Sequence, residues 1–203
     1  METRDPQKNN LQILTIGHSD HPLRHFLGLL KCYSVDVIVD TRSYPYSNFA
    51  PQYDQVPLRA ALQSEGFRYV HLGRELGGRP EGDEYYDSEG HVLYGKVANS
   101  DFFKAGVMRL EQGIRKYNVA LLCSEENPMN CHRRLLIARV LLRDGIEIDH
   151  IRGDGRLQSE TELSQQIDSN HPQMDLFKET EASEWKSIPS VLRKRRQSSS
   201  SAL

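Results

Sequence analysis

The chain has 203 residues and a formal net charge of -2 at pH 7, a length that fits one domain with an appendage better than two full domains. The near-neutral charge excludes a global basic field that would draw the protein onto nucleic acid or an anionic membrane, so any such contact needs a local patch. Hydrophobic residues make up 37% of the sequence and the mean hydropathy of -0.62 is low, so part of the chain is expected to contribute little to a core.

The sequence has no feature of export or membrane insertion. Its first ten residues are polar and its longest apolar stretches are only a few residues, so we expect neither a signal peptide nor a membrane span. The three cysteines Cys32, Cys123 and Cys131 are an odd number, which favours reduced thiols over a disulfide framework. We therefore predict a cytoplasmic protein that does not contact a membrane.

Short apolar segments rich in β-branched residues alternate with longer segments of helical period. This pattern is typical of a three-layer, Rossmann-like α/β fold, in which a mostly parallel sheet has helices on both faces. The expected strands are 11–16, 35–40, 67–72, 119–123 and 146–151. The expected helices are 22–32, 56–64, 102–116 and 132–143.

Three regions are predicted along the chain: a disordered N-terminus (1–10), the α/β domain (11–157) and a flexible C-terminal tail (158–203). After residue 157 the periodicity fades into scattered charges, a basic run and a serine run, a composition that cannot bury enough apolar surface to fold alone. Segment 73–96 is rich in glycine, polar and aromatic residues, and we interpret it as a lid or substrate loop, with a plain surface excursion as the alternative.

Polar residues follow four of the predicted strands, where an open parallel sheet binds its ligands. In chain order these residues are His18 and Ser19; Asp40, Arg42 and Ser47; Gly77 and Gly78; and Cys123 and Glu125. The next helix begins at Cys131, His132 and Arg133. We expect all of them to face one crevice.

The start of the last predicted helix carries the strongest chemical signal. A helix N-terminus binds anions and lowers the pKa of a thiol placed there, so Cys131 has the position of an activated thiol. Arg133 adds a charge suited to phosphate or carboxylate. Cys123 lies ten residues before Arg133 and Cys131 two, and neither is the spacing of a phosphatase loop.

A zinc site is the alternative for the same residues. Cys123, Cys131, His132 and His18 offer suitable donors, but the seven residues between the two cysteines match none of the usual short ligand spacings. We therefore predict no metal site and leave the cofactor unknown. The alternative for Cys123 is a small buried residue at a strand end.

Four residues are the predicted catalytic groups: His18, Asp40, Glu125 and Cys131. His18 alternatively caps the following helix, and Asp40 alternatively pairs with Arg42 or Arg133. The predicted substrate-binding residues are Ser19, Arg42, Ser47, Gly77, Gly78, Cys123, His132 and Arg133. Aromatic side chains after the second strand either stack on a nucleobase or cover a hydrophobic edge; they are Tyr44, Tyr46, Phe49 and Tyr53.

Five spaced motifs, over about residues 11–155, resemble the family catalogued as domain of unknown function 488. They are Thr15-Ile16-Gly17-His18-Ser19; Val39-Asp40-Thr41-Arg42 with Pro45 and Ser47; Leu72-Gly73 with Leu76-Gly77-Gly78; Leu122-Cys123-Ser124-Glu125 with Pro128; and Cys131-His132-Arg133. The family name assigns no activity, so the resemblance implies only that these polar motifs belong to one shared site.

A peptide in the predicted tail is similar to the one by which bacterial replication and repair proteins dock on the sliding clamp. It reads Gln173-Met174-Asp175-Leu176-Phe177 and offers a glutamine for hydrogen bonding and Leu-Phe anchors for an apolar pocket. Docking would place the protein near DNA, where the basic run at 193–196 adds attraction. The alternative is that its apolar residues pack back onto the domain as a last amphipathic turn.

Together these features predict an enzyme that acts on a nucleotide, nucleobase or nucleic-acid substrate and is associated with DNA repair. One alternative is a non-catalytic sensor or adaptor that binds a small anion. Another is a redox protein that uses Cys123 and Cys131, which requires Cα atoms no more than about 7 Å apart.

Overall fold

The computed structural model describes residues 11–47, 49–170 and 185–189, and six strands form one sheet in the order β3-β2-β4-β1-β5-β6. The strands are β1 (Gln12–Gly17), β2 (Val37–Asp40), β3 (Arg68–His71), β4 (Val119–Cys123), β5 (Glu147–Ile151) and β6 (Leu157–Ser159). The first five run parallel, and β6 pairs antiparallel with β5. The predicted mostly parallel α/β sheet is therefore confirmed, and each expected strand overlaps an observed one.

Helices connect these strands as the sequence predicts. They are α1 (Leu23–Cys32), α2 (Gln55–Ser64), α3 (Gly73–Leu76), α4 (Tyr94–Asn99), α5 (Asp101–Ile114), α6 (Arg139–Arg143) and α7 (Glu160–Asn170), with 3-10 turns η1 (Pro51–Tyr53), η2 (Asp83–Tyr85) and η3 (Pro128–Asn130). The helix expected at 132–143 begins as a π-helical segment, η4 (Arg133–Ala138), and continues as α6. Such segments are rare and often adjoin functional sites.

Segment 73–96 is not the free loop that its composition suggests. It contains α3, η2 and the start of α4. Leu76, Val92 and Tyr94 are fully buried in the core on one face of the sheet. Because this apolar surface is already buried, opening the whole segment as a lid would expose it to water at a substantial cost.

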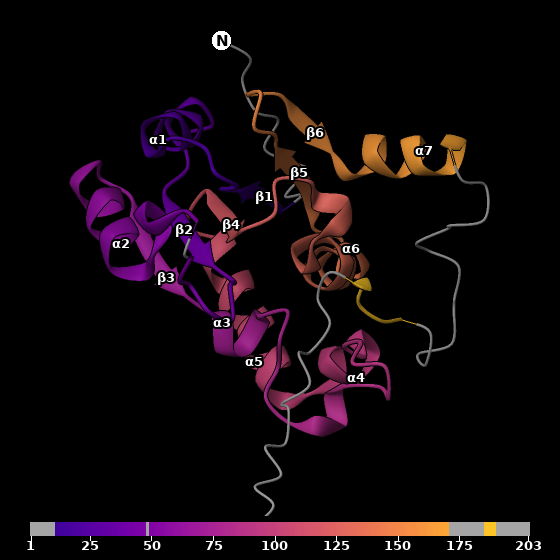
Figure 1. Cartoon of the computed structure of the whole chain (residues 1–203). Coiled ribbons are helices and arrows are strands. Elements are labelled where there is room, and N and C mark those ends of the chain that lie inside the picture. The colour runs from indigo at the N-terminus through magenta and orange to yellow at the C-terminus, as the bar shows by residue number, and fades with distance from the viewer. Residues whose placement is uncertain (1–10, 48, 171–184, 190–203) are drawn as a thin grey trace, which may run out of the picture.

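Two separate apolar cores show that helices cover both faces of the sheet. One core joins α1 and α2 to the strand residues on the face of the sheet that they cover, such as Ile16, Ile38 and Leu122. The other joins α3, α4, α5 and the η4–α6 helix to the alternate strand residues, such as Val39 and Leu121. In Figure 1, α1 and α2 lie together on one side of the molecule, away from α4, α5 and α6. This is the three-layer arrangement expected.

The order of the strands shows where the connections between them reverse direction across the sheet. From β1 the chain crosses through α1 to β2 on one side, and from β4 it crosses through η4 and α6 to β5 on the other side. Strands β2 and β4 are neighbours, and the chain continues from β2 toward β3 in one direction but from β4 toward β5 in the other, so their carboxyl ends flank the topological switch point. In open parallel sheets this is the crevice in which ligands bind.

Folded structure continues beyond residue 157, where the sequence pattern predicted a boundary. Strand β6 extends the sheet there, and Leu163 of α7 is buried. Further along, Trp185 is largely buried and donates from Nε1 to the carbonyl of Leu135 at 2.8 Å. Residues 1–10 and the clamp-like peptide 173–177 lie outside the described residues. In the part of the chain that is described, no helix has the length and apolar character needed to cross a bilayer.

Candidate functional site

A pocket of about 230 Å³ opens at the carboxyl ends of β2 and β4, beside the switch point. Its walls are formed by Arg42, Ser43, Tyr44, Tyr46, Gly78, Arg79, Cys123, Ser124, Glu125, Asn130 and His132. The structure thus brings five predicted site residues to one cavity, Arg42, Gly78, Cys123, Glu125 and His132. The rim carries two tyrosines, Tyr44 and Tyr46, which are 66% and 67% exposed.

Behind the pocket, Asp40 and Arg42 form a buried ion pair. Asp40 is fully buried and accepts from Arg42 Nε at 2.9 Å and Nη2 at 2.6 Å. The hydroxyl of Tyr69 also donates to Asp40, at 2.7 Å. With its oxygens already occupied in this way, Asp40 is not placed to accept a proton from a ligand; its position agrees with the alternative that it pairs with Arg42.

His18 holds the other side of the Arg42 guanidinium. Its Nδ1 lies 2.6 Å from the Ser19 carbonyl, which can only accept, so Nδ1 carries the proton. Nε2 is then the acceptor for Arg42 Nη1 at 3.1 Å. Burial and the Arg42 charge lower the pKa of His18 to about 4, so the ring is neutral at pH 7. His18 stacks on Tyr53 with ring centroids 4.2 Å apart and positions Arg42 rather than reaching the pocket.

The two cysteines meet His132 and Glu125 at the floor of the pocket. Cys123 Sγ lies 2.9 Å from Glu125 Oε2 and 3.6 Å from His132 Nδ1. Cys131 Sγ lies 3.4 Å and 3.9 Å from the same two atoms. His132 Nε2 donates to the Thr41 carbonyl at 3.1 Å, which leaves Nδ1 directed at the sulfurs. Both thiols are free and buried.

Charges around the cysteine pair favour one thiolate. Burial opposes ionisation of Cys131, but a hydrogen bond from Cys123 and the charge of Arg133 outweigh it and hold the pKa of Cys131 well below its usual range. The hydrogen bond to Cys131 and burial raise the pKa of Cys123. Burial disfavours the charged form of His132, yet its contact with Cys131 raises the pKa of the ring. The arrangement suits a nucleophilic or metal-binding sulfur.

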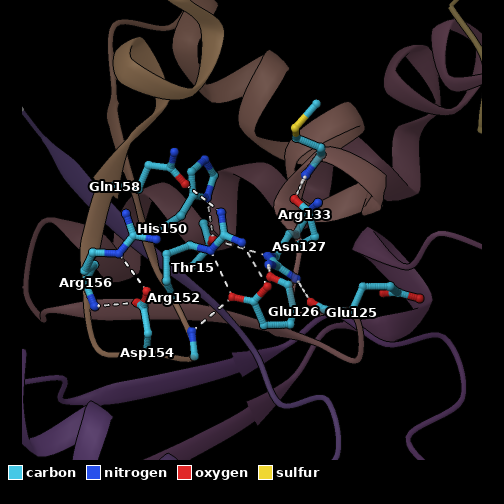
Figure 2. A network of polar contacts seen from close by, with 12 residues as sticks. Thr15, Glu125, Glu126, Asn127, Arg133, His150, Arg152, Asp154, Arg156 and Gln158 are labelled. Carbon is cyan, nitrogen blue, oxygen red and sulfur yellow. Dashed lines mark hydrogen bonds and ion pairs between the residues drawn. The ribbon is translucent and has the colours of Figure 1, made fainter. Parts of the chain in front are cut away.

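Arg133 supports this floor from beneath instead of binding a ligand. It is fully buried, donates from Nη1 to the carbonyl of Glu125 and from Nη2 to that of Glu126 at 2.5 Å, and contacts Thr15 through Nε. Figure 2 shows Arg133 directed at this turn, with the side chain of Glu125 pointing away from the network. The predicted role of Arg133 as an anion-binding residue is therefore not supported by its position.

The neighbouring Glu126 fixes the same turn. Arg152 contacts both of its carboxylate oxygens, each at 2.9 Å, and the backbone N–H of Gly153 donates to it (Figure 2). These hydrogen bonds lower the pKa of Glu126. At Gly17, a Cβ atom would lie 1.8 Å from the Glu125 carbonyl, so only glycine lets β1 pass this closely behind the turn.

Three other predicted ligand-binding residues do not line the pocket. Ser19 has a φ of 46° and donates its backbone N–H to the Ser124 carbonyl. Ser47 accepts from the backbone of Ala50 and so shapes its own loop. Gly77 is packed against Ser43. By contrast Gly78 faces the site: a Cβ there would come within 2.8 Å of the His132 ring.

The pocket also contains residues that the sequence did not single out, chiefly Ser43, Arg79 and Asn130. Arg79 is exposed, and its backbone N–H donates to Ser43 Oγ at 2.9 Å. It lies in segment 73–96, whose pattern gave no indication of which side chain would return to the strand ends. The only sequence signal for a role of Arg79 was its position directly after the paired glycines Gly77 and Gly78.

The donor atoms of Cys123, Cys131 and His132 all lie within 4.8 Å of one another. They form one of the two groups of three or more potential metal ligands in the described residues; the other is Asp87, Glu89 and His91 on the surface. The spacing of the two cysteines in the sequence did not indicate that their sulfurs lie close together, because the fold, and not a short ligand loop, brings the strand end at Cys123 to the helix start at Cys131.

The fold and this site define a doubly wound α/β protein with a polar pocket at its switch point. The sequence profile described as "Domain of unknown function DUF488" matches residues 22–140, which include Asp40, Arg42 and the whole Cys123–Arg133 turn. The chain belongs to this family. No curated protein and no solved structure matches it.

Proposed function

We propose that the protein is an enzyme that acts on a nucleobase or nucleotide held in this pocket. The observation that carries the proposal is the combination of two exposed tyrosines at the rim with a thiol, an imidazole and a carboxylate at the floor. Base–aromatic stacking contributes about 1–3 kcal/mol per base. The volume of about 230 Å³ is below the roughly 300–1,000 Å³ of clefts for drug-sized ligands, which suits a base-sized group.

The charges of the lining residues fit a phosphate next to the base. Arg79 is exposed at the pocket, and Arg42 also lines it, although three of the Arg42 guanidinium N–H groups are used by Asp40 and His18. Arginine suits phosphate because its donors are fixed in one plane. In this proposal Glu125, which lines the pocket, exchanges protons with the bound ligand, and the adjacent cluster of Cys123, Cys131 and His132 supplies a nucleophilic or metal-binding sulfur.

Thermal denaturation with adenine, cytosine, AMP, CMP and an oligothymidylate strand tests the proposal. A ligand at about 100 times its Kd stabilises the folded state by about 2.7 kcal/mol, which raises the Tm of a chain of this length by about 5–10 °C. Tyr44→Leu and Tyr46→Leu should each weaken binding by about 1–3 kcal/mol. Tyr117→Leu, at an exposed tyrosine outside the pocket, is the matched control. No shift with any of these ligands would contradict the proposal.

Glu125→Gln separates catalysis from simple binding. An enzyme with this site should lose turnover of the bound ligand while its affinity stays within about threefold. A non-catalytic anion-binding module should show no turnover in the wild type and should depend mainly on Arg79, measured with Arg79→Ala.

We further propose a cytoplasmic location, which the three free cysteines support, and an association with DNA through a sliding clamp. The support for the clamp is the sequence of the peptide Gln173–Phe177 alone, since that peptide lies outside the described residues.

A further inference from the structure

We propose that Cys123, Cys131 and His132 bind a zinc ion at the floor of the pocket. The three donor atoms come from two elements, the carboxyl end of β4 and the turn that leads into η4. They are almost fully buried and converge on one point between them. Two thiolates with one imidazole form a donor set that selects zinc over hard cations such as magnesium.

The separations between the donors match a tetrahedral zinc site. With Zn–S near 2.3 Å and Zn–N near 2.0–2.1 Å, tetrahedral angles place neighbouring donors about 3.5–3.8 Å apart. Observed distances to His132 Nδ1 are 3.6 Å from Cys123 Sγ and 3.9 Å from Cys131 Sγ. The two sulfurs lie within 4.8 Å of one another, so small side-chain movements close the three donors around an ion.

The surroundings of His132 already hold the ring in the orientation that a ligand needs. Its Nε2 donates to the Thr41 carbonyl, and metal-binding histidines typically donate their second ring N–H to such an acceptor. Gly78 lies against the ring, so closely that a Cβ atom there would be at 2.8 Å. The ring is thus fixed from two sides, with Nδ1 facing the sulfurs.

Three protein ligands leave a fourth position for water, which is the pattern of catalytic rather than structural zinc sites. Cys123, His132 and Glu125 line the pocket, and the Glu125 carboxylate lies against both sulfurs. A histidine, two cysteines and a nearby glutamate are also the groups with which zinc deaminases attack a nucleobase. That use of the metal rests on the proposed function of the pocket, whereas zinc binding does not.

The test measures metal in the full-length protein with no nucleotide present, so its result does not depend on the proposed substrate. Metal-free protein is titrated with Zn²⁺ against a chromophoric chelator, and with Co²⁺ while the absorption spectrum is recorded. We expect about one ion per chain, with thiolate-to-cobalt charge transfer and the visible bands of tetrahedral cobalt. Cys131→Ser and His132→Gln should weaken Zn²⁺ binding by at least about 100-fold.

Cys32→Ser is the matched control, because Cys32 is exposed and remote from the pocket, and it should bind Zn²⁺ like the wild type. A second measurement needs no variant: bound Zn²⁺ should protect Cys123 and Cys131, but not Cys32, from alkylation. Wild-type protein that binds no Zn²⁺, that binds it equally after Cys131→Ser, or whose Cys123 and Cys131 thiols alkylate at the same rate with and without Zn²⁺ would overturn the proposal.

Discussion

Glu160→Gln removes the charge from a buried carboxylate that lies beyond the domain boundary expected from the sequence. Glu160 is 5% exposed and Arg134 2% exposed. Arg134 Nε is 2.9 Å from both carboxylate oxygens, and its Nη2 is 2.7 Å from Oε1. His150 Nε2 and Ser164 Oγ complete the site at 2.8 Å and 3.0 Å. Glutamine keeps the shape of this side chain but leaves Arg134 as a buried charge without its partner.

Loss of one partner from a buried ion pair costs about 3–5 kcal/mol. Natural domains have total stabilities of roughly 5–15 kcal/mol, so the variant should lose about a fifth or more of its stability. In terms of the folding equilibrium constant, the change is about two to three and a half orders of magnitude.

Urea unfolding at neutral pH measures this change, with the single tryptophan, Trp185, as the fluorescent probe. We expect a lower midpoint and an unchanged slope. Glu162→Gln is the matched control: Glu162 is exposed on the same helix and accepts from the Ser159 backbone, a contact that glutamine also makes. Its effect should stay within about 0.5 kcal/mol. If Glu160→Gln is as stable as Glu162→Gln, the buried pair does not stabilise the fold.

Three further predictions follow from the same structure. Burial opposes the charge of Glu160, yet hydrogen bonds from His150 and Arg134 lower its pKa, and burial lowers the pKa of His150. Both groups therefore bind fewer protons in the folded state than in the unfolded state, so the free energy of unfolding should fall as pH drops below about 6.5 and again below about 4.5. A free energy of unfolding that does not change between about pH 7 and pH 4 would contradict this. Gly78→Ala should destabilise the protein and weaken Zn²⁺ binding, because the added Cβ meets the His132 ring. In the control Gly28→Ala the added Cβ meets nothing within 4 Å inside α1, so that variant should be more stable by about 0.5–1 kcal/mol. Equal urea midpoints for the two variants would argue against the close contact at Gly78. Full-length protein should bind a purified bacterial sliding clamp in surface plasmon resonance, and the double variant Leu176→Ala, Phe177→Ala should lose that binding. Equal binding by the wild type and the double variant would exclude the peptide as the docking site.

The central strands were predictable because they are short apolar runs buried on both faces of the sheet, as in Val119–Cys123. Strand β6 and helix α7 were missed for a physical reason: β6 has three residues, and α7 carries mostly polar residues. Helix α7 is held in place by buried Leu163 and by the contact of Glu160 with Arg134, 26 residues away in the chain. Periodicity within a short window contains no information about such a pair.

The sequence predicted which edge of the sheet carries the pocket, but not the directions of the individual side chains. Parallel strands bring their carboxyl ends to one edge, which correctly united Arg42, Cys123 and Glu125 at one pocket. The direction of each side chain depends on local packing. Asp40 turned toward Arg42 and Arg133 turned toward backbone carbonyls, and sequence alone cannot choose between a buried ion pair and a ligand contact for such residues.

The most direct test of the pocket as the ligand site is an ¹H–¹⁵N correlation spectrum of the labelled protein, recorded while AMP or CMP is added. Residues 42–46, 78–79 and 123–132 should shift together and saturate at one ligand concentration. The second cavity, beside Arg139 and Trp185, should stay unchanged. Shifts centred on that second cavity, or no saturable shifts at the strand ends, would contradict the assignment of the switch-point pocket.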